Sequence, residues 1–72
     1  MILVEIFKTN VNNKRDATKM IKKLSFLESG YIVNFDLDDC DRILRIESNK
    51  KININSVIKL LKENNFNCEI LN

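Results

Sequence analysis

Histidine, proline and tryptophan are absent from this chain of 72 residues, which has one glycine and two cysteines. Without histidine, Ser-His and Cys-His nucleophilic pairs and histidine-ligated zinc sites are excluded. No other catalytic set is evident, so we do not expect an enzyme. Without proline, and with Gly30 as its one glycine, the chain has little that would form a long structureless linker. Cys40 and Cys68 are too few and too far apart for a disulfide framework or a zinc ribbon.

Long apolar runs are lacking as well. No stretch approaches the roughly 20 residues of a membrane-spanning helix. Met1 leads directly into the apolar residues Ile2, Leu3 and Val4, without the basic segment and the small-residue cleavage pattern of a signal peptide. We therefore expect a cytoplasmic protein. The formal net charge of +2 is too small by itself to predict a nucleic-acid or a membrane partner, and we expect neither.

The residues that are present indicate one small folded domain over residues 1–72. Hydrophobic residues make up 44% of the chain, enough for one core, and charged residues make up 31%, enough for a well-hydrated surface. These fractions disfavour a disordered chain, which would contain fewer apolar residues. A domain of this size lies at the small end of what folds without disulfides or metals.

Residues 31–48 show the clearest local pattern, which is that of a β-hairpin. Apolar residues alternate with polar ones in two short runs, Val33, Phe35 and Leu37, then Leu44 and Ile46. A period of two places these side chains on one face of a strand pair. Residues 38–41 between the runs read Asp-Asp-Cys-Asp. Aspartate favours turns because its short side chain bonds to nearby backbone, so we predict a hairpin with an acidic tip.

A helix is predicted before the hairpin, where apolar residues recur with helical spacing at Ala17, Met20, Ile21, Leu24 and Leu27. Asn12 or Asn13 is expected to cap its start, and Gly30 is expected to end it in the left-handed conformation. The basic residues lie mostly off the apolar stripe, and we interpret them as a solvated face: Arg15, Lys19, Lys22 and Lys23.

A second helix is predicted after the hairpin, where Val57, Ile58 and Leu61 have the same spacing. Asn55 or Ser56 would cap its start. The helix is expected to end at residues 64–65, which are both Asn, because Asn is the best occupant of a left-handed position after Gly.

Strands at residues 2–7 and 67–71 complete the order strand, helix, strand, strand, helix, strand. Right-handed crossover connections place both helices on the same face of the sheet. We therefore predict an α+β, ferredoxin-like fold. Its antiparallel four-stranded sheet has the strand order 4-1-3-2, with one face covered by the two helices and the other face open.

This topology brings three segments to one end of the sheet: the loop at residues 8–16, the acidic tip with Cys40, and Cys68 of the last strand. Any functional site that used both cysteines would lie there. Two inter-strand spacings, roughly 10 Å, separate the strands that carry them. A disulfide needs Cα atoms about 5.5–6 Å apart, so we predict two unpaired thiols.

Four segments carry a resemblance to a known family. They are the opening strand at residues 2–6, the strands Val33-Asn-Phe-Asp-Leu37 and Leu44-Arg-Ile46, and the ending of the second helix, Leu61 followed by Asn65-Phe66. Over nearly its whole length the chain resembles the heavy-metal-associated domain, the small ferredoxin-like module of copper and mercury chaperones and of P-type metal ATPases. The family usually has Gly before the aromatic residue, where this chain has Asn65.

The loop after the first strand departs from that family. There the family carries Gly-Met-x-Cys-x-x-Cys, whose two thiolates hold a soft metal ion. Residues 7–16 of this chain read Phe-Lys-Thr-Asn-Val-Asn-Asn-Lys-Arg-Asp and contain no Cys, His or Met. No metal ligand therefore carries over from the family, and no cofactor is expected.

These observations predict a non-enzymatic, heavy-metal-associated-like binding or interaction module without the thiolate loop. The alternative is a metallochaperone-like carrier of a soft metal ion that uses a non-standard site near Cys40 and Cys68. The acidic tip lacks the spacing of an EF-hand loop and its bidentate Glu, so turn chemistry explains its aspartates better than a hard cation does.

The open face of the sheet is a candidate interaction surface. If Val4, Phe35 and Leu44 point toward the helices, four large apolar residues lie on the outer face: Leu3, Phe7, Ile43 and Leu71. Such a strip can be residual apolar surface, which every protein has, or a patch for a protein partner or for self-association. RNA-binding proteins of this topology stack bases on aromatic residues of the central strands. The strand after the hairpin tip has none, and acidic residues on this face would repel phosphate.

Overall fold

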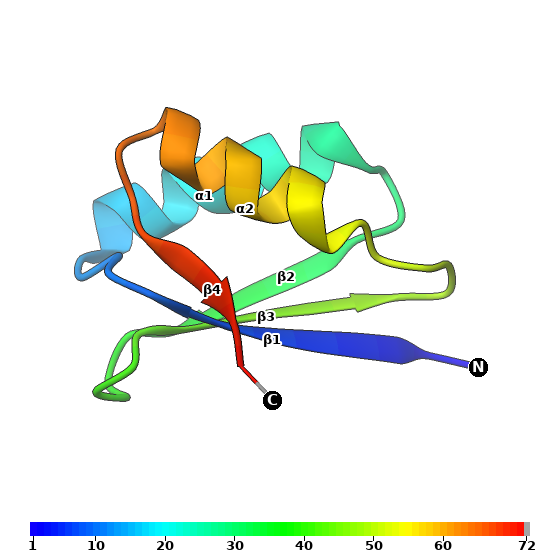
Figure 1. The fold of residues 1–72 in the computed structure, drawn as a ribbon, viewed down its shortest axis with the longest axis horizontal. Helices are drawn as coiled ribbons and strands as arrows, with labels where there is room; N and C mark the ends of the chain where they lie inside the picture. The colour runs from blue at the N-terminus through cyan, green and yellow to red at the C-terminus, as the bar shows by residue number, and fades with distance from the viewer. Residues whose placement is uncertain (72) are drawn as a thin grey trace.

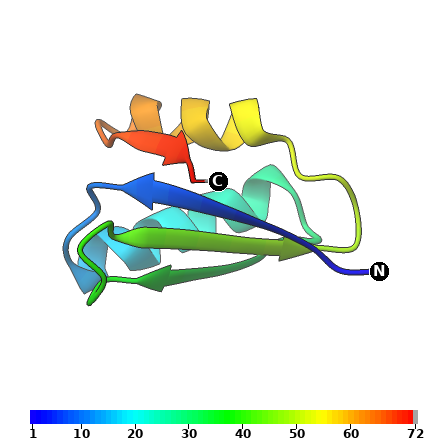
Figure 2. The same cartoon turned by 60° about the horizontal axis from the view of Figure 1, so that its bottom comes forward.

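The computed structural model describes residues 1–71 and contains the six predicted elements in the predicted order. They are β1 (Leu3–Thr9), α1 (Lys14–Leu27), β2 (Ile32–Asp36), β3 (Ile43–Ser48), α2 (Ile54–Glu63) and β4 (Cys68–Ile70). The strands form one antiparallel sheet in the order β2-β3-β1-β4. Both helices lie on the same side of this sheet, and the opposite side is open (Figures 1 and 2). The ferredoxin-like prediction is therefore confirmed.

The register of β1 against β3 decides which side chains face the helices. Phe7 pairs with Leu44, and Leu3 pairs with Ser48. Side chains of directly paired residues lie on the same face, and Phe7, Leu44 and Ser48 are all buried. Leu3 and Phe7 therefore face the helices, and their predicted place on the open face is wrong. Val4, predicted to point inward, lies on the open face with 40% of its surface exposed.

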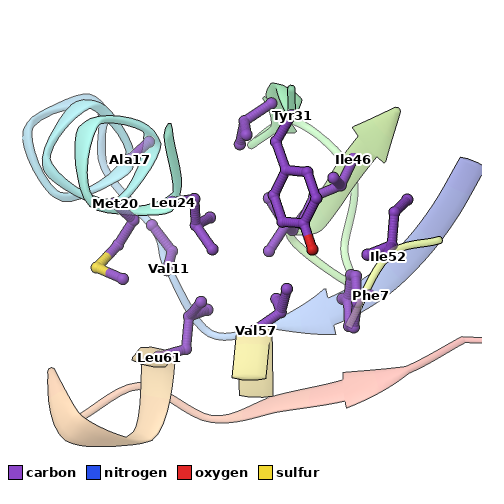
Figure 3. Packing of buried hydrophobic residues seen from close by; sticks show 12 residues of the cluster. Phe7, Val11, Ala17, Met20, Leu24, Tyr31, Ile46, Ile52, Val57 and Leu61 are labelled. Carbon is purple, nitrogen blue, oxygen red and sulfur yellow. The ribbon is translucent and has the colours of Figure 1, made fainter. Parts of the chain in front are cut away.

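The core fills the space between the helices and the sheet. Figure 3 shows Val11 among Met20 and Leu24 of α1 and Leu61 of α2. The buried apolar residues are Phe7, Val11, Ala17, Met20, Leu24, Tyr31, Val33, Leu44, Ile46, Ile52, Val57 and Leu61. The Tyr31 hydroxyl accepts a hydrogen bond of 3.0 Å from the backbone N–H of Asn53, which ties the start of the hairpin to the start of α2.

Two helix ends differ from the predictions. Helix α1 is capped by Asn13, one of the two predicted residues, whose side chain accepts from the N–H of Asp16. Helix α2 is capped by Asn53, which accepts from the N–H of Ser56, so Asn55 and Ser56 were the wrong choices. Helix α1 ends at an extended Glu28, and Gly30 does not have a positive φ, so the predicted left-handed cap at Gly30 is wrong.

The C-terminal end of α2 has the predicted left-handed residue. Asn65 has φ of 69°. Its N–H donates to the carbonyl of Lys62 over 3.0 Å, and the N–H of Phe66 donates to the carbonyl of Leu61 over 2.9 Å. This pair of bonds is the Schellman motif. The side chain of Phe66 packs against the core, so the turn sets the path of the chain into β4.

Candidate functional site

Three segments distant in sequence meet at one end of the sheet, as predicted. The N–H of Thr9 donates to the carbonyl of Asp41 in the hairpin tip over 3.1 Å. The Thr9 hydroxyl donates to the carbonyl of Arg42 over 2.6 Å. The side-chain oxygen of Asn10 accepts from the N–H of Asn67 over 2.8 Å. The loop after β1 is therefore attached to the hairpin tip on one side and to the start of β4 on the other.

The loop at residues 10–13 is closed by contacts within the chain. Val11 is fully buried in the core, and its N–H donates to the Thr9 hydroxyl over 3.2 Å. The side chain of Asn13 caps α1 over 2.8 Å. Sequence patterns did not reveal the bond from Asn67 to Asn10, because it joins residues 57 positions apart. This loop therefore turns an apolar side chain inward, and residues 10–13 contain no thiol.

Cys40 lies exposed at the tip of the hairpin. The carboxylate of Asp39 accepts from the N–H of Asp41 over 2.8 Å, and the carbonyl of Asp39 accepts from the N–H of Arg42 over 3.0 Å. Arg42 has φ of 46°, and its guanidinium donates back to the carbonyl of Leu37. The side chain of Asp39 therefore stabilises the turn, as the sequence suggested.

Cys68 lies half-buried in β4, opposite Thr9 in the register. Burial raises the pKa of its thiol from 9.0 to about 12, and the negative charge of Glu69 adds to the effect. A metal ligand must be the thiolate, and forming the thiolate at Cys68 is therefore less favourable than at an ordinary cysteine. The predicted absence of a disulfide is confirmed, since both cysteines are free.

The two cysteines do not join in one ligand cluster. Within residues 1–71, the potential ligand atoms of Asp39, Cys40 and Asp41 lie within 4.8 Å of one another, and Cys68 is not part of this group. A single thiol with two carboxylate oxygens is a mixed donor set. It matches neither the all-sulfur site typical of Cu(I) nor the all-oxygen site typical of Ca²⁺.

The open sheet face carries five apolar side chains, among them the predicted Ile43 and Leu71. The other three were not predicted: Val4, Ile6 and Ile32. Val4 and Ile32 both pair with Glu47, and Ile6 pairs with Arg45, which places all of them on the side away from the helices. Val4, Ile32 and Leu71 are exposed. We use the name open sheet face for the surface formed by Val4, Ile6, Ile32, Ile43 and Leu71.

Comparisons with known proteins support the fold. A solved structure described as "CsoZ metallochaperone" superimposes with a TM-score of 0.75 at 18% sequence identity, and the match covers 100% of both chains. An identity this low shows a shared fold alone. No protein-family model and no curated protein matches the chain, so the resemblance to heavy-metal-associated domains stays a prediction. Among the described residues, neither helix has the length and apolar character to cross a bilayer.

Proposed function

We propose that this protein is a non-catalytic binding module that acts through its surface, without a metal ion in the loop after β1. The hydrogen bonds and the burial of residues 10–13 are the observations that support this proposal. The side chains of Asn10 and Asn13 accept hydrogen bonds from backbone N–H groups of the same chain, and Val11 is buried. A loop that binds a soft metal presents accessible thiolates to the incoming ion. Residues 10–13 have no side chain that could form a thiolate.

The open sheet face is the surface we assign to binding, and a second copy of the chain is the partner that fits it. A two-fold contact brings a surface against itself, so a charged surface must carry both signs to be complementary. Around the apolar residues of this face lie side chains of both signs, Lys8 and Arg45 together with Asp36, Glu47 and Glu69. Arg45 and Glu47 already form an ion pair of 3.8 Å within one chain.

A competition titration tests the absence of a metal site. The protein is titrated under reducing conditions against a chromophoric Cu(I) chelator, together with Cys40→Ser and Cys68→Ser. We expect less than one equivalent of Cu(I) per chain and no difference among the three proteins. The double variant Asn10→Cys/Asn13→Cys provides the positive control, because it restores the Cys-x-x-Cys spacing and should withdraw one equivalent. Stoichiometric uptake by the wild type, lost in Cys40→Ser, would overturn the proposal.

A soft-metal carrier is the second candidate. It is supported by the shared fold with a structure described as a metallochaperone and by the proximity of Asp39, Cys40 and Asp41. In this alternative Cys40 supplies the thiolate, because the thiol of Cys68 must first lose a proton against its raised pKa. The same titration decides between the two, since only the carrier loses uptake in Cys40→Ser.

A further inference from the structure

The exposed side of α1 carries a stripe of cations that ends in an aromatic residue. Arg15, Lys19, Lys22 and Phe26 follow one another at steps of four, three and four residues, which places them on one line along the helix. Thr18 and Lys23 border the same shallow surface hollow. The buried residues Ala17, Met20 and Leu24 occupy the opposite side. We call Arg15, Lys19, Lys22, Lys23 and Phe26 the α1 stripe.

Charge in this molecule is unevenly distributed. Helix α1 contains five basic residues and one acidic residue, Asp16, which lies in its first turn. The rest of the chain contains seven basic and nine acidic residues. Within residues 1–71 the ion pairs join Lys8 to Asp41 and Arg45 to Glu47, so no described acidic side chain neutralises the α1 stripe. A net charge of +2 thus conceals a strongly positive helix on an otherwise slightly negative protein.

Phe26 is the most exposed aromatic side chain of the described residues, with 91% of its surface accessible, and Leu27 beside it is 42% exposed. A phenylalanine contributes nothing to the core from this position. Its neighbours in the stripe are cations, so a protein partner that covered it would also have to bury or pair the lysines around it. Interface cores between proteins are depleted in lysine, which argues against an acidic protein as the occupant.

We infer that the α1 stripe binds the surface of an anionic lipid bilayer, in place of the solvated face and the absent membrane partner that the sequence alone led us to expect. Lysine and arginine can hold their charges among lipid headgroups while their aliphatic stems lie along an apolar layer. An aromatic residue between them can enter the boundary of the acyl chains. Helix α1 forms part of the outer layer of the molecule (Figure 1), so its long side can lie flat on a membrane without unfolding any element. The association is peripheral and reversible.

Vesicle co-sedimentation tests this inference. The wild type is expected to bind phosphatidylcholine vesicles that contain phosphatidylserine, to bind pure phosphatidylcholine much less, and to dissociate as salt is added. Lys19→Gln/Lys22→Gln should weaken binding by about 25-fold, since each cation near such a surface contributes roughly a factor of five. The matched control is Lys50→Gln/Lys51→Gln, which removes the same charge from an exposed loop and should change binding less than about threefold.

Phe26→Trp gives an independent reading, because the protein has no other tryptophan. Insertion should shift its emission to the blue on anionic vesicles. Three results would overturn the inference: no binding of the wild type to anionic vesicles, equal loss in the two double variants, or binding without a blue shift. Retention on heparin without binding to vesicles would also overturn it, because the α1 stripe would then recognise polyanions or acidic macromolecules and not a bilayer.

Discussion

Thr9 is the residue that joins the end of β1 to the hairpin tip. Its buried hydroxyl donates to Arg42 and accepts from Val11, so Thr9→Val keeps the shape of the side chain but leaves two backbone groups without a partner. We expect a loss of about 1–3 kcal/mol in the free energy of unfolding, measured by urea denaturation. Thr18→Val, the same change on the exposed surface of α1, should stay within about 0.5 kcal/mol. Equal effects of the two variants would show that the bonds of Thr9 contribute nothing.

The thiol of Cys68 should make stability depend on pH in the alkaline range. Its pKa is about 12 in the folded protein and 9.0 when unfolded, so the unfolded chain loses this proton first. The stabilising contribution is complete below pH 9.0 and decreases toward pH 12. We therefore expect the wild type to lose stability relative to Cys68→Ala as pH rises above 9.0. The free energy of unfolding should fall by well under about 1.4 kcal/mol per pH unit, the limit for the loss of one proton, because the side chain is partly solvated.

Cys68→Ala is the reference for this measurement because the two proteins differ only at residue 68, so the contributions of all other groups cancel in the difference. Urea midpoints are measured at several pH values below 9.0 and between 9.0 and 12. Parallel stability profiles of the two proteins would contradict a raised pKa at this position.

At the scale of the element, the residues that follow the two helices differ in backbone conformation: Asn65 after α2 has a positive φ, and Gly30 after α1 does not. An added Cβ at Gly30 would lie 3.9 Å from the Ser48 hydroxyl oxygen, an ordinary contact, and no positive φ demands glycine there. Gly30→Ala should therefore stabilise the protein by about 0.4–1 kcal/mol. Asn65 does have a positive φ, so Asn65→Ala should destabilise by about 1 kcal/mol and Asn65→Gly should not. Thermal unfolding measures all three, and a stabilising Asn65→Ala would refute the assignment of this cap.

The elements themselves were predictable because their patterns are local. The alternation in β2 and β3 and the helical spacing in α1 and α2 each fit one period, and right-handed crossovers then left one topology. Which side chains of β1 point toward the helices was not predictable, because residues 2–4 and 6–7 are all apolar and show no alternation. A shift of the strand by one residue moves every side chain to the opposite face of the sheet. The true capping residue of α2, Asn53, lies between isoleucines, where the more polar Asn55-Ser56 pair was the stronger local signal.

The candidate site was predictable in its position but not in its chemistry. Topology alone brought the loop after β1, Cys40 and Cys68 to one end of the sheet, and the hydrogen bonds of Thr9 and Asn10 confirm the meeting of these three segments. The conformation of the loop depends on hydrogen bonds from Thr9 to Arg42 and from Asn67 to Asn10, which join residues 33 and 57 positions apart. Bonds between such distant residues leave no pattern in a short window of sequence. The burial of Val11 has the same explanation, since its neighbours come from both helices.

At the scale of the whole molecule, the two broad surfaces of the protein differ in chemistry. Helix α1 on one side carries the cations and Phe26, and the open sheet face on the other carries apolar residues with charges of both signs. Helix α1 lies on the side of the sheet opposite to the open sheet face (Figure 2), so one surface can bind a membrane while the other contacts a second copy. The proposed self-association and the inferred lipid binding are thus independent, and variants of one surface should leave the other activity unchanged.

Self-association through the open sheet face is expected to be weak. Its five apolar residues are interspersed with charged ones, and Ile6 and Ile43 are only partly exposed, so little apolar area would be removed from water in a contact. Sedimentation velocity over a wide range of concentration should therefore show a monomer that shifts toward a dimer only at the upper end. Val4→Lys and Ile32→Lys place a charge in the contact and should abolish the shift. Leu27→Lys, at a similarly exposed apolar position on α1, should preserve it. A wild type that remains monomeric throughout, or a loss of the dimer in Leu27→Lys alone, would remove the open sheet face as the site of association.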